Sequence, residues 1–229
     1  MRHIFALFIT LISINTYAFK LSPMSITLDK DSEFKGTIQV QNESSEPLAI
    51  EISMAKRVMD TKGSETHPEA NSLFEIYPAQ IILTPKQKRS IRVTWKGDKK
   101  IESEQAFRLI AEQLPIEIDG KKKAGIKLLL KYIAAIYVTG DDNKSDIQTA
   151  IIAQKENKLS IKIDNKGTKH QILKDAEIIL YSGKNEFKIK TEELKNLAGE
   201  NILAKNTREF EIKIPTTNKI EKIRLKFND

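Results

Sequence analysis

Apolar and polar residues alternate in short segments along most of this 229-residue chain. A period of two places the apolar side chains of a β-strand on one face of a sheet. Turn-forming residues such as Asn, Asp, Ser, Gly and Pro separate the segments at 42–47, 60–64 and 85–88. The clearest alternating positions are Ile38 and Val40; Leu48, Ile50 and Ile52; and Ile91, Val93 and Trp95. Several half-buried strands at this spacing predict an all-β sandwich.

The segment 125–138, GIKLLLKYIAAIYV, alternates like a strand but is apolar on both faces. One face carries Ile126, Leu128, Leu130, Tyr132, Ala134, Ile136 and Val138. The other face carries Leu129, Ile133, Ala135 and Tyr137, together with Lys127 and Lys131. One face of a sheet cannot bury both rows. The strand is therefore either central in its sandwich or covered by something else.

A polar stretch at 139–145 follows this strand and is the best position for a linker between domains. Alternating segments then resume at 147–153, 159–163, 176–180, 187–189, 210–214 and 220–227. They predict a second sandwich of ordinary domain size. We expect an N-terminal domain at 19–139, a linker at 140–145 and a C-terminal domain at 146–229. Residues 191–197 alone favour a short helical turn, capped by Thr191.

Residues 1–18 have the features of a secretory signal peptide. Arg2 and His3 precede an apolar run at 4–14, and Thr16, Tyr17 and Ala18 form a small-residue cleavage signal. A run of about eleven residues is short for a spanning helix, which needs roughly twenty; a retained hydrophobic anchor is the alternative. We expect a mature, exported chain that starts at Phe19 and inserts no later segment into a membrane. It contains no cysteine, so its domains must be stable without disulfides.

Positive charge is spread over the chain rather than concentrated in a patch. Without residues 1–18 there are 37 basic and 31 acidic residues, a net charge of +6, and the one compact run is at 121–123. A nucleic-acid partner would favour a clustered basic face, and export makes such a partner unexpected. The pattern is typical of a Lys-rich solvated surface.

The usual sequence signatures of enzymes are missing. There is no GxSxG, GxGxxG or GxxxxGK[ST] motif, and His67 and His170 belong to no metal-binding HExxH or HxH pair. Both histidines are predicted to be ordinary surface residues. We therefore expect no enzyme activity, no cofactor and no metal site. An exported hydrolase that uses Glu112 or His67 remains an alternative.

Several segments, in this order, resemble the PapD-like periplasmic chaperones of the chaperone-usher pilus assembly pathway. The sharpest is 107–115, FRLIAEQLP, similar to the strand ending in Glu-x-Ile/Leu-Pro that helps to define the family. The other similar segments are 42–47, 74–85, 89–93, 165–167 and 199–214. The resemblance covers most of the mature chain and implies two immunoglobulin-like β-sandwich domains set at an angle.

The resemblance also implies a function without bond chemistry. Such a chaperone binds an incomplete pilus or fimbrial subunit by lending it a strand, and delivers it to an outer-membrane usher. The segment 125–138 would be the donor strand, with Ile126, Leu128 and Leu130 as donor side chains. A one-residue bulge would instead present the other face, including Leu129. The expected location is the periplasm.

The chain departs from this family at the place where a basic pair clamps the subunit's terminal carboxylate. The first-strand position falls at Met24 or Ser25, and the donor-strand position at Ala134 or Ala135; none is basic. Charge-assisted hydrogen bonds to a carboxylate cannot form there. The candidates for this anchoring role are Lys131, Arg108 and Arg92, and the alternative for each is an ordinary surface charge.

A second class of function fits the same strand pattern. A secreted two-domain immunoglobulin-like adhesion or structural protein would also contain a strand that is apolar on both faces, simply because it is buried. Co-purification of a client subunit distinguishes the two functions.

Overall fold

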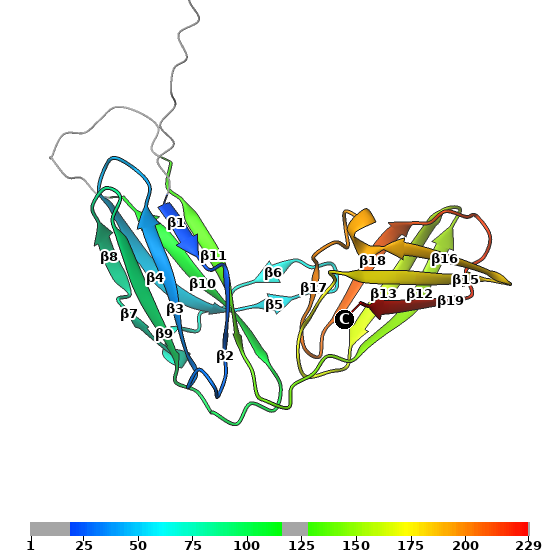
Figure 1. Cartoon of the computed structure of the whole chain (residues 1–229), viewed down its shortest axis with the longest axis horizontal. Coiled ribbons are helices and arrows are strands. Elements are labelled where there is room, and N and C mark those ends of the chain that lie inside the picture. Colours follow the sequence, from blue (N-terminus) through cyan, green and yellow to red (C-terminus); the bar gives the residue numbers. More distant parts are fainter. Residues whose placement is uncertain (1–18, 116–127, 229) are drawn as a thin grey trace, which may run out of the picture.

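The computed structural model describes residues 19–115 and 128–228, which form two β-sandwiches set at an angle (Figure 1). A hairpin of β5 (Val58–Met59) and β6 (Glu65–Thr66) spans the space between the sandwiches. The predicted all-β, two-sandwich fold is thereby confirmed. Residues 1–18, the predicted signal peptide, lie outside the described residues.

The first sandwich contains two sheets. In the described ranges, the four-stranded sheet has the order β1 (Phe19–Ser22), β3 (Lys35–Asn42), β9 (Lys88–Trp95), β7 (Phe74–Tyr77). The five-stranded sheet has the order β2 (Ser25–Leu28), β11 (Lys131–Val138), β10 (Gln105–Leu114), β4 (Leu48–Lys56), β8 (Gln80–Leu83). A short 3-10 turn, η1 (Asn71–Leu73), precedes β7.

The core between these sheets is built from the alternating positions of the sequence. The apolar residues predicted to face inward in β3, β4 and β9 are all buried. Three aromatic rings meet at its centre, where Phe74 lies 5.1 Å from Trp95 and 4.9 Å from Phe107, each in an edge-to-face arrangement. Such pairs add to the burial of apolar area, which is worth about 1.5–3 kcal/mol for one large side chain.

The second sandwich has a core of its own. One sheet has the order β12 (Ile147–Lys155), β13 (Lys158–Asn165), β18 (Thr207–Lys213), and the other β16 (Asn185–Lys190), β15 (Ala176–Ser182), β19 (Lys222–Phe227). A small pair, β14 (Gln171–Ile172) with β17 (Asn201–Ile202), lies beside them. The apolar residues facing the gap between the larger sheets form one buried cluster.

The short helical turn predicted at 191–197 is present only as a 3-10 turn, η2 (Thr191–Glu193), and Thr191 does not cap it. The N-cap is Lys190, which makes no side-chain cap bond. The buried hydroxyl of Thr191 instead donates to the carbonyl oxygen of Ala176 at 3.1 Å. The Thr191 hydroxyl thus forms a hydrogen bond with a residue distant in sequence, and not the predicted cap bond within its own turn.

Each sandwich uses one fully buried asparagine at the end of a strand. In the first, Asn42 Nδ2 donates to the carbonyl oxygens of Leu83 and Thr84, both at 3.1 Å. In the second, Asn165 Nδ2 donates to the carbonyl oxygens of Lys169 at 2.8 Å and Ile202 at 3.2 Å. These amides satisfy loop carbonyls that would otherwise be buried without partners.

The polar stretch between the sandwiches is hydrogen-bonded to both. Asn143 accepts from the backbone N–H of Gly140 at 2.7 Å and donates to the carbonyl oxygen of Glu102 at 3.0 Å. On the other side, the N–H of Thr168 donates to the carbonyl oxygen of Lys144 at 2.7 Å. The segment predicted as a linker is therefore tied to each sandwich, and the exact domain boundaries stay a prediction.

Candidate functional site

The two-faced strand β11 is paired along only part of its length on one side. It pairs with β10 throughout, but with β2 only from Ala135 to Val138. Leu130 accepts a hydrogen bond at its carbonyl oxygen from Gln113 N, whereas Ala135 N donates to Met24 on the opposite side, each at 2.9 Å. Because backbone groups alternate in direction along a strand, those of residues 129, 131 and 133 point away from β10. The described residues provide no strand partner for them, so this stretch is an open edge.

The side chains of this segment pass gradually from solvent into the core. Leu128 is 73% exposed, Leu130 and Tyr132 are half-buried against the first core, and Ala134 is fully buried. The ring of Tyr132 packs edge-to-face on Phe19 of β1, with centroids 4.7 Å apart. An apolar row continuous with the core thus reaches the surface where β11 lies beside β1 (Figure 1).

The outer row of β11 changes character at Ala135. Leu129 is 42% exposed and Ile133 36%, but Ala135 and Tyr137 are buried in a small apolar cluster with Met59 of the hairpin and Leu203 of the second sandwich. The second half of the strand is therefore apolar on both faces because the junction between the sandwiches covers it. The first half has no such cover from the described residues.

Of the three side chains predicted to be donated, two are described. Leu128 is exposed, Leu130 is half-buried against the first core, and Ile126 lies outside the described residues. Among the proposed anchoring residues, Lys131 forms an ion pair with Glu112 at 2.7 Å. Their assignment to a partner stays a prediction.

The other two anchoring residues lie apart from the open edge. Arg92 is on β9 of the opposite sheet, where it lines a shallow depression with Glu75 and Tyr77. Arg108 is on β10 and is engaged by a carboxylate of the hairpin, Glu65. Met24 and Ala135, two of the positions where a basic clamp was expected, are joined by the backbone hydrogen bond described above. These two positions are therefore neighbours, and their correspondence to the clamp positions of the family stays a prediction.

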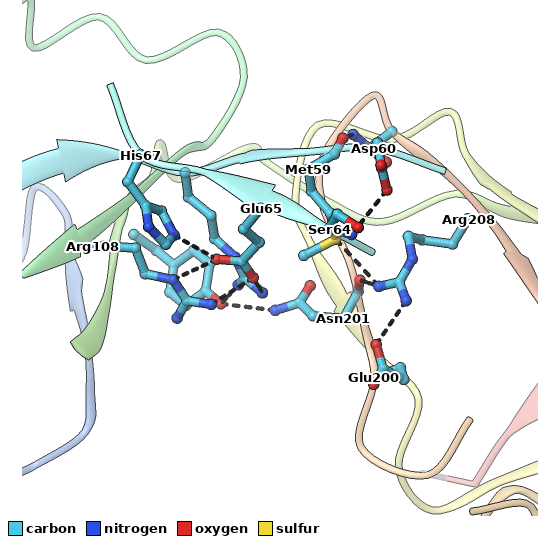
Figure 2. Close-up of polar contacts among 12 residues, drawn as sticks. Met59, Asp60, Ser64, Glu65, His67, Arg108, Glu200, Asn201 and Arg208 are labelled. Atoms are coloured by element: carbon cyan, nitrogen blue, oxygen red, sulfur yellow. Dashed lines mark hydrogen bonds and ion pairs between the residues drawn. The ribbon is translucent and has the colours of Figure 1, made fainter. Parts of the chain in front are cut away.

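Glu65 is the centre of a polar cluster at the base of the hairpin (Figure 2). Arg108 donates to both of its carboxylate oxygens, at 2.6 and 2.9 Å. Arg57 donates from Nε at 2.9 Å and lies 2.7 Å away through Nη2, and His67 Nε2 lies 3.1 Å away. Burial alone would raise the pKa of Glu65, but the hydrogen bonds from Arg108, His67 and Arg57 outweigh it and lower the pKa to about 2. Glu65 is therefore ionised at neutral pH and forms charge-assisted hydrogen bonds with the guanidinium groups of Arg57 and Arg108.

Tyr137 connects this cluster to the second sandwich. Its hydroxyl accepts from Arg57 Nη1 at 3.0 Å and from Asn201 Nδ2 at 2.7 Å. Its ring stacks on His170, with centroids 4.0 Å apart, and His170 Nδ1 lies 2.6 Å from the buried carboxylate of Glu104. Burial raises the pKa of the Tyr137 phenol, so it stays neutral at physiological pH.

His67 is exposed, as predicted, although it contacts Glu65, whereas His170 is partly buried against the buried carboxylate of Glu104 and is not an ordinary surface residue. No local motif marks them, because Glu104 is 66 positions from His170 in sequence. In the described part of the chain, His, Asp and Glu residues form no cluster able to hold a metal ion. Nor do these ranges contain a helix of the length and apolarity needed to cross a bilayer.

Residues 18–136 match the family model described as pili and flagellar-assembly chaperone, PapD N-terminal domain. The chain belongs to this family, as its sequence resemblance had indicated. The family consists of non-enzymatic chaperones, and the expectation that the chain is not an enzyme is confirmed on that ground. A sequence search of curated proteins finds no match.

Solved structures with a similar fold include several fimbrial chaperones. The class 5 fimbriae chaperone CfaA is 19% identical with a TM-score of 0.62, covering 93% of this chain and 100% of that one. A chain of the CsuC–CsuE chaperone–tip adhesion subunit complex of Acinetobacter baumannii is 16% identical with a TM-score of 0.57, covering 84% and 89%. At these identities the similarity establishes the shared two-domain fold.

Proposed function

We propose that this protein is a periplasmic assembly chaperone that binds an incomplete pilus or fimbrial subunit by donor-strand complementation. It holds the subunit on the open edge of β11 and delivers it to an outer-membrane usher. Family membership supports the chaperone class over a secreted adhesion or structural protein. Solved relatives of similar fold include a SafA pilin in complex with the SafB chaperone from Salmonella enterica.

The open edge of β11 is the single observation that carries this proposal. An unpaired strand edge offers N–H and C=O groups to an incoming strand, and the adjacent apolar row offers side chains to an incomplete core. Leu128 and Leu130 supply that row, with Ile126 before them in the sequence. Addition of a subunit strand would also cover an edge that otherwise invites aggregation.

The side-chain contribution is tested by Leu128→Asp, alone and with Leu130→Asp. The chaperone is co-expressed with each small β-rich exported protein of the neighbouring reading frames, and periplasmic complexes are isolated. Burial of one leucine is worth about 1.5–3 kcal/mol, so we expect Leu128→Asp to weaken capture by roughly 10- to 100-fold. Leu128→Asp is the cleaner variant, because Leu130 also packs on the chaperone's own core.

Ile82→Asp is the matched control. Ile82 is 68% exposed on β8, at the opposite edge of the same five-stranded sheet. Like Leu128→Asp, the Ile82→Asp substitution adds one negative charge to the first sandwich, but far from the open edge, and it should leave subunit capture unchanged. Equal capture by the Leu128 variants and the unmodified chain would overturn the assignment of the donor side chains.

The main-chain contribution is tested by Ile133→Pro. The N–H of Ile133 points to the open edge, so proline there removes an edge donor without removing a hydrogen bond to β10. We expect loss of capture with a folded first sandwich. Retained capture would contradict binding through this edge.

A further inference from the structure

The β5–β6 hairpin joins the first sandwich to the free edge of a sheet in the second. In the described residues β18 is the last strand of the order β12-β13-β18, so its outer edge has no neighbouring strand. The backbone N–H of Glu209 on β18 donates to the carbonyl oxygen of Thr61 at the hairpin tip, at 2.7 Å. Lys62 Nζ forms an ion pair with the Glu209 carboxylate at 2.6 Å. The tip therefore covers a sheet edge of the other domain.

The tip has a defined shape before it meets that edge. Asp60 N donates to the carbonyl oxygen of Ser64 at 3.0 Å. Asp60 Oδ1 accepts from the backbone N–H groups of Lys62 and Ser64, both at 2.9 Å. These bonds close the turn within itself, while the Glu65 cluster fixes the base of the hairpin to β10. Both ends of the connection are thus rigidly held.

Arg208 of β18 lies directly against the hairpin, where it approaches the backbone of Gly63 closely. Gly63 has φ of +90°, and a Cβ at this position would lie 2.3 Å from Arg208 Nη2. Arg208 is 4% exposed, with Nη2 2.9 Å from Glu200 and Nη1 3.3 Å from the carbonyl oxygen of Asn201. An added methyl group would therefore have to displace this buried guanidinium from its partners, or move the hairpin or the strand.

Two further contacts hold the hairpin in place. Asn206 Nδ2 donates to the carbonyl oxygen of Met59 at 3.1 Å. The Met59 side chain lies among Ala135, Tyr137 and Leu203, which brings together the hairpin, β11 and the second sandwich in one buried cluster. The hairpin therefore contacts both β11 and the second sandwich.

We propose that the β5–β6 hairpin is a latch that holds the second sandwich at one orientation relative to β11. The close contact between Gly63 and Arg208 allows the hairpin to pack against β18 in this position. The effect of the latch on partner capture rests on the proposed function. While the hairpin is bound to β18, the second sandwich keeps a fixed position beside the open edge of β11. The latch itself is a property of the free chain. It can be tested with no partner present.

The test is a distance distribution between spin labels, one on each sandwich. The chain contains no cysteine, so Arg89→Cys on β9 and Lys188→Cys on β16 give two exposed labelling sites with no background. The parent pair should give one narrow distribution, and adding Gly63→Ala should broaden or shift it. Far-UV circular dichroism and the fluorescence of Trp95, the single tryptophan, check that both proteins are folded.

Gly183→Ala is the matched control. Gly183 also has positive φ, +57°, in a hairpin turn of the second sandwich, but a Cβ there would meet nothing within 4 Å. Gly183→Ala also adds a methyl group at a residue of positive φ, but away from the junction, and should leave the distribution narrow. A second variant, Lys62→Ala with Asn206→Ala, removes two side-chain contacts of the tip and should also broaden it. Parent-like distributions for both the Gly63 and the Lys62/Asn206 variants would overturn the latch, whether or not subunit capture is observed.

Discussion

Replacement of Glu65 by glutamine isolates the charge at the base of the hairpin. Glu65→Gln keeps the size of the side chain and one acceptor oxygen, but removes the negative charge that faces Arg57 and Arg108. Both guanidinium groups are largely buried, so they cannot regain full hydration when their counter-charge is lost. The variant should therefore be less stable than the parent chain at neutral pH.

The size and the pH dependence of this effect follow from the pKa of Glu65. A decrease from 4.5 to about 2 corresponds to about 3 kcal/mol, since one pKa unit is about 1.4 kcal/mol. A carboxyl group whose pKa is lower in the folded state stabilises that state fully above its unfolded pKa. The contribution disappears as the pH falls from about 4.5 towards 2. Once the pH falls below the folded pKa of about 2, Glu65 is protonated and the parent and the glutamine variant should have nearly equal stability.

The assay is urea unfolding followed by tryptophan fluorescence at a series of pH values. Trp95 is the single tryptophan and is buried in the first sandwich, so its signal reports the unfolding of the domain that contains Glu65, Arg57 and Arg108. Glu33→Gln is the control, because Glu33 is exposed and its ion pair with exposed Lys35 should matter little. Parallel stability curves for the parent and Glu65→Gln between pH 7 and 2.5 would refute this account of the cluster.

Three further predictions concern buried polar side chains, the first measured by the same assay and the other two by hydrogen exchange. Asn42→Ala removes the amide that satisfies buried loop carbonyls of the first sandwich, so it should lower the free energy of unfolding reported by Trp95 by about 1–3 kcal/mol. Asn165→Ala should leave the Trp95 transition in place but destabilise the second sandwich, as measured by hydrogen exchange of β13; a shift of the Trp95 transition of similar size would contradict separate cores. Tyr137→Phe leaves the buried amide of Asn201 without its acceptor and should cost about 1–3 kcal/mol, visible as faster hydrogen exchange of β17; unchanged exchange would show that the contact is dispensable.

The strands of both sandwiches could be predicted because their signal is local. An alternation such as Ile91, Val93 and Trp95 is set by the geometry of one strand and the presence of one core, and it needs no knowledge of the partner strand. The turn at 60–64 was visible for the same reason. Its flanking strands were not, because two residues on each side are too few to show a period.

The polar junction could not be predicted, because its partners are distant in the chain. Glu65 meets Arg108 across 43 positions, and Lys62 meets Glu209 across 147. Charged residues at such separations look like any solvated surface until the fold brings them together. One signal was available: a Gly inside the turn at 60–64 marks a position where positive φ or a close approach is required, and Gly63 has both.

The apolar faces of β11 serve two different purposes along one strand. From Ala135 onwards β11 has no free edge or exposed face, because β2 pairs with its edge and the junction with Met59 and Leu203 covers its outer face. Before Ala135 the inner row merges with the core at Tyr132, while the described residues leave the edge unpaired. A partner strand that adds to this edge must therefore end near Ala134, where β2 begins. The two-faced periodicity of β11 thus covers two regions: an edge that we propose to bind a subunit strand, and a buried junction at which the proposed latch positions the second sandwich.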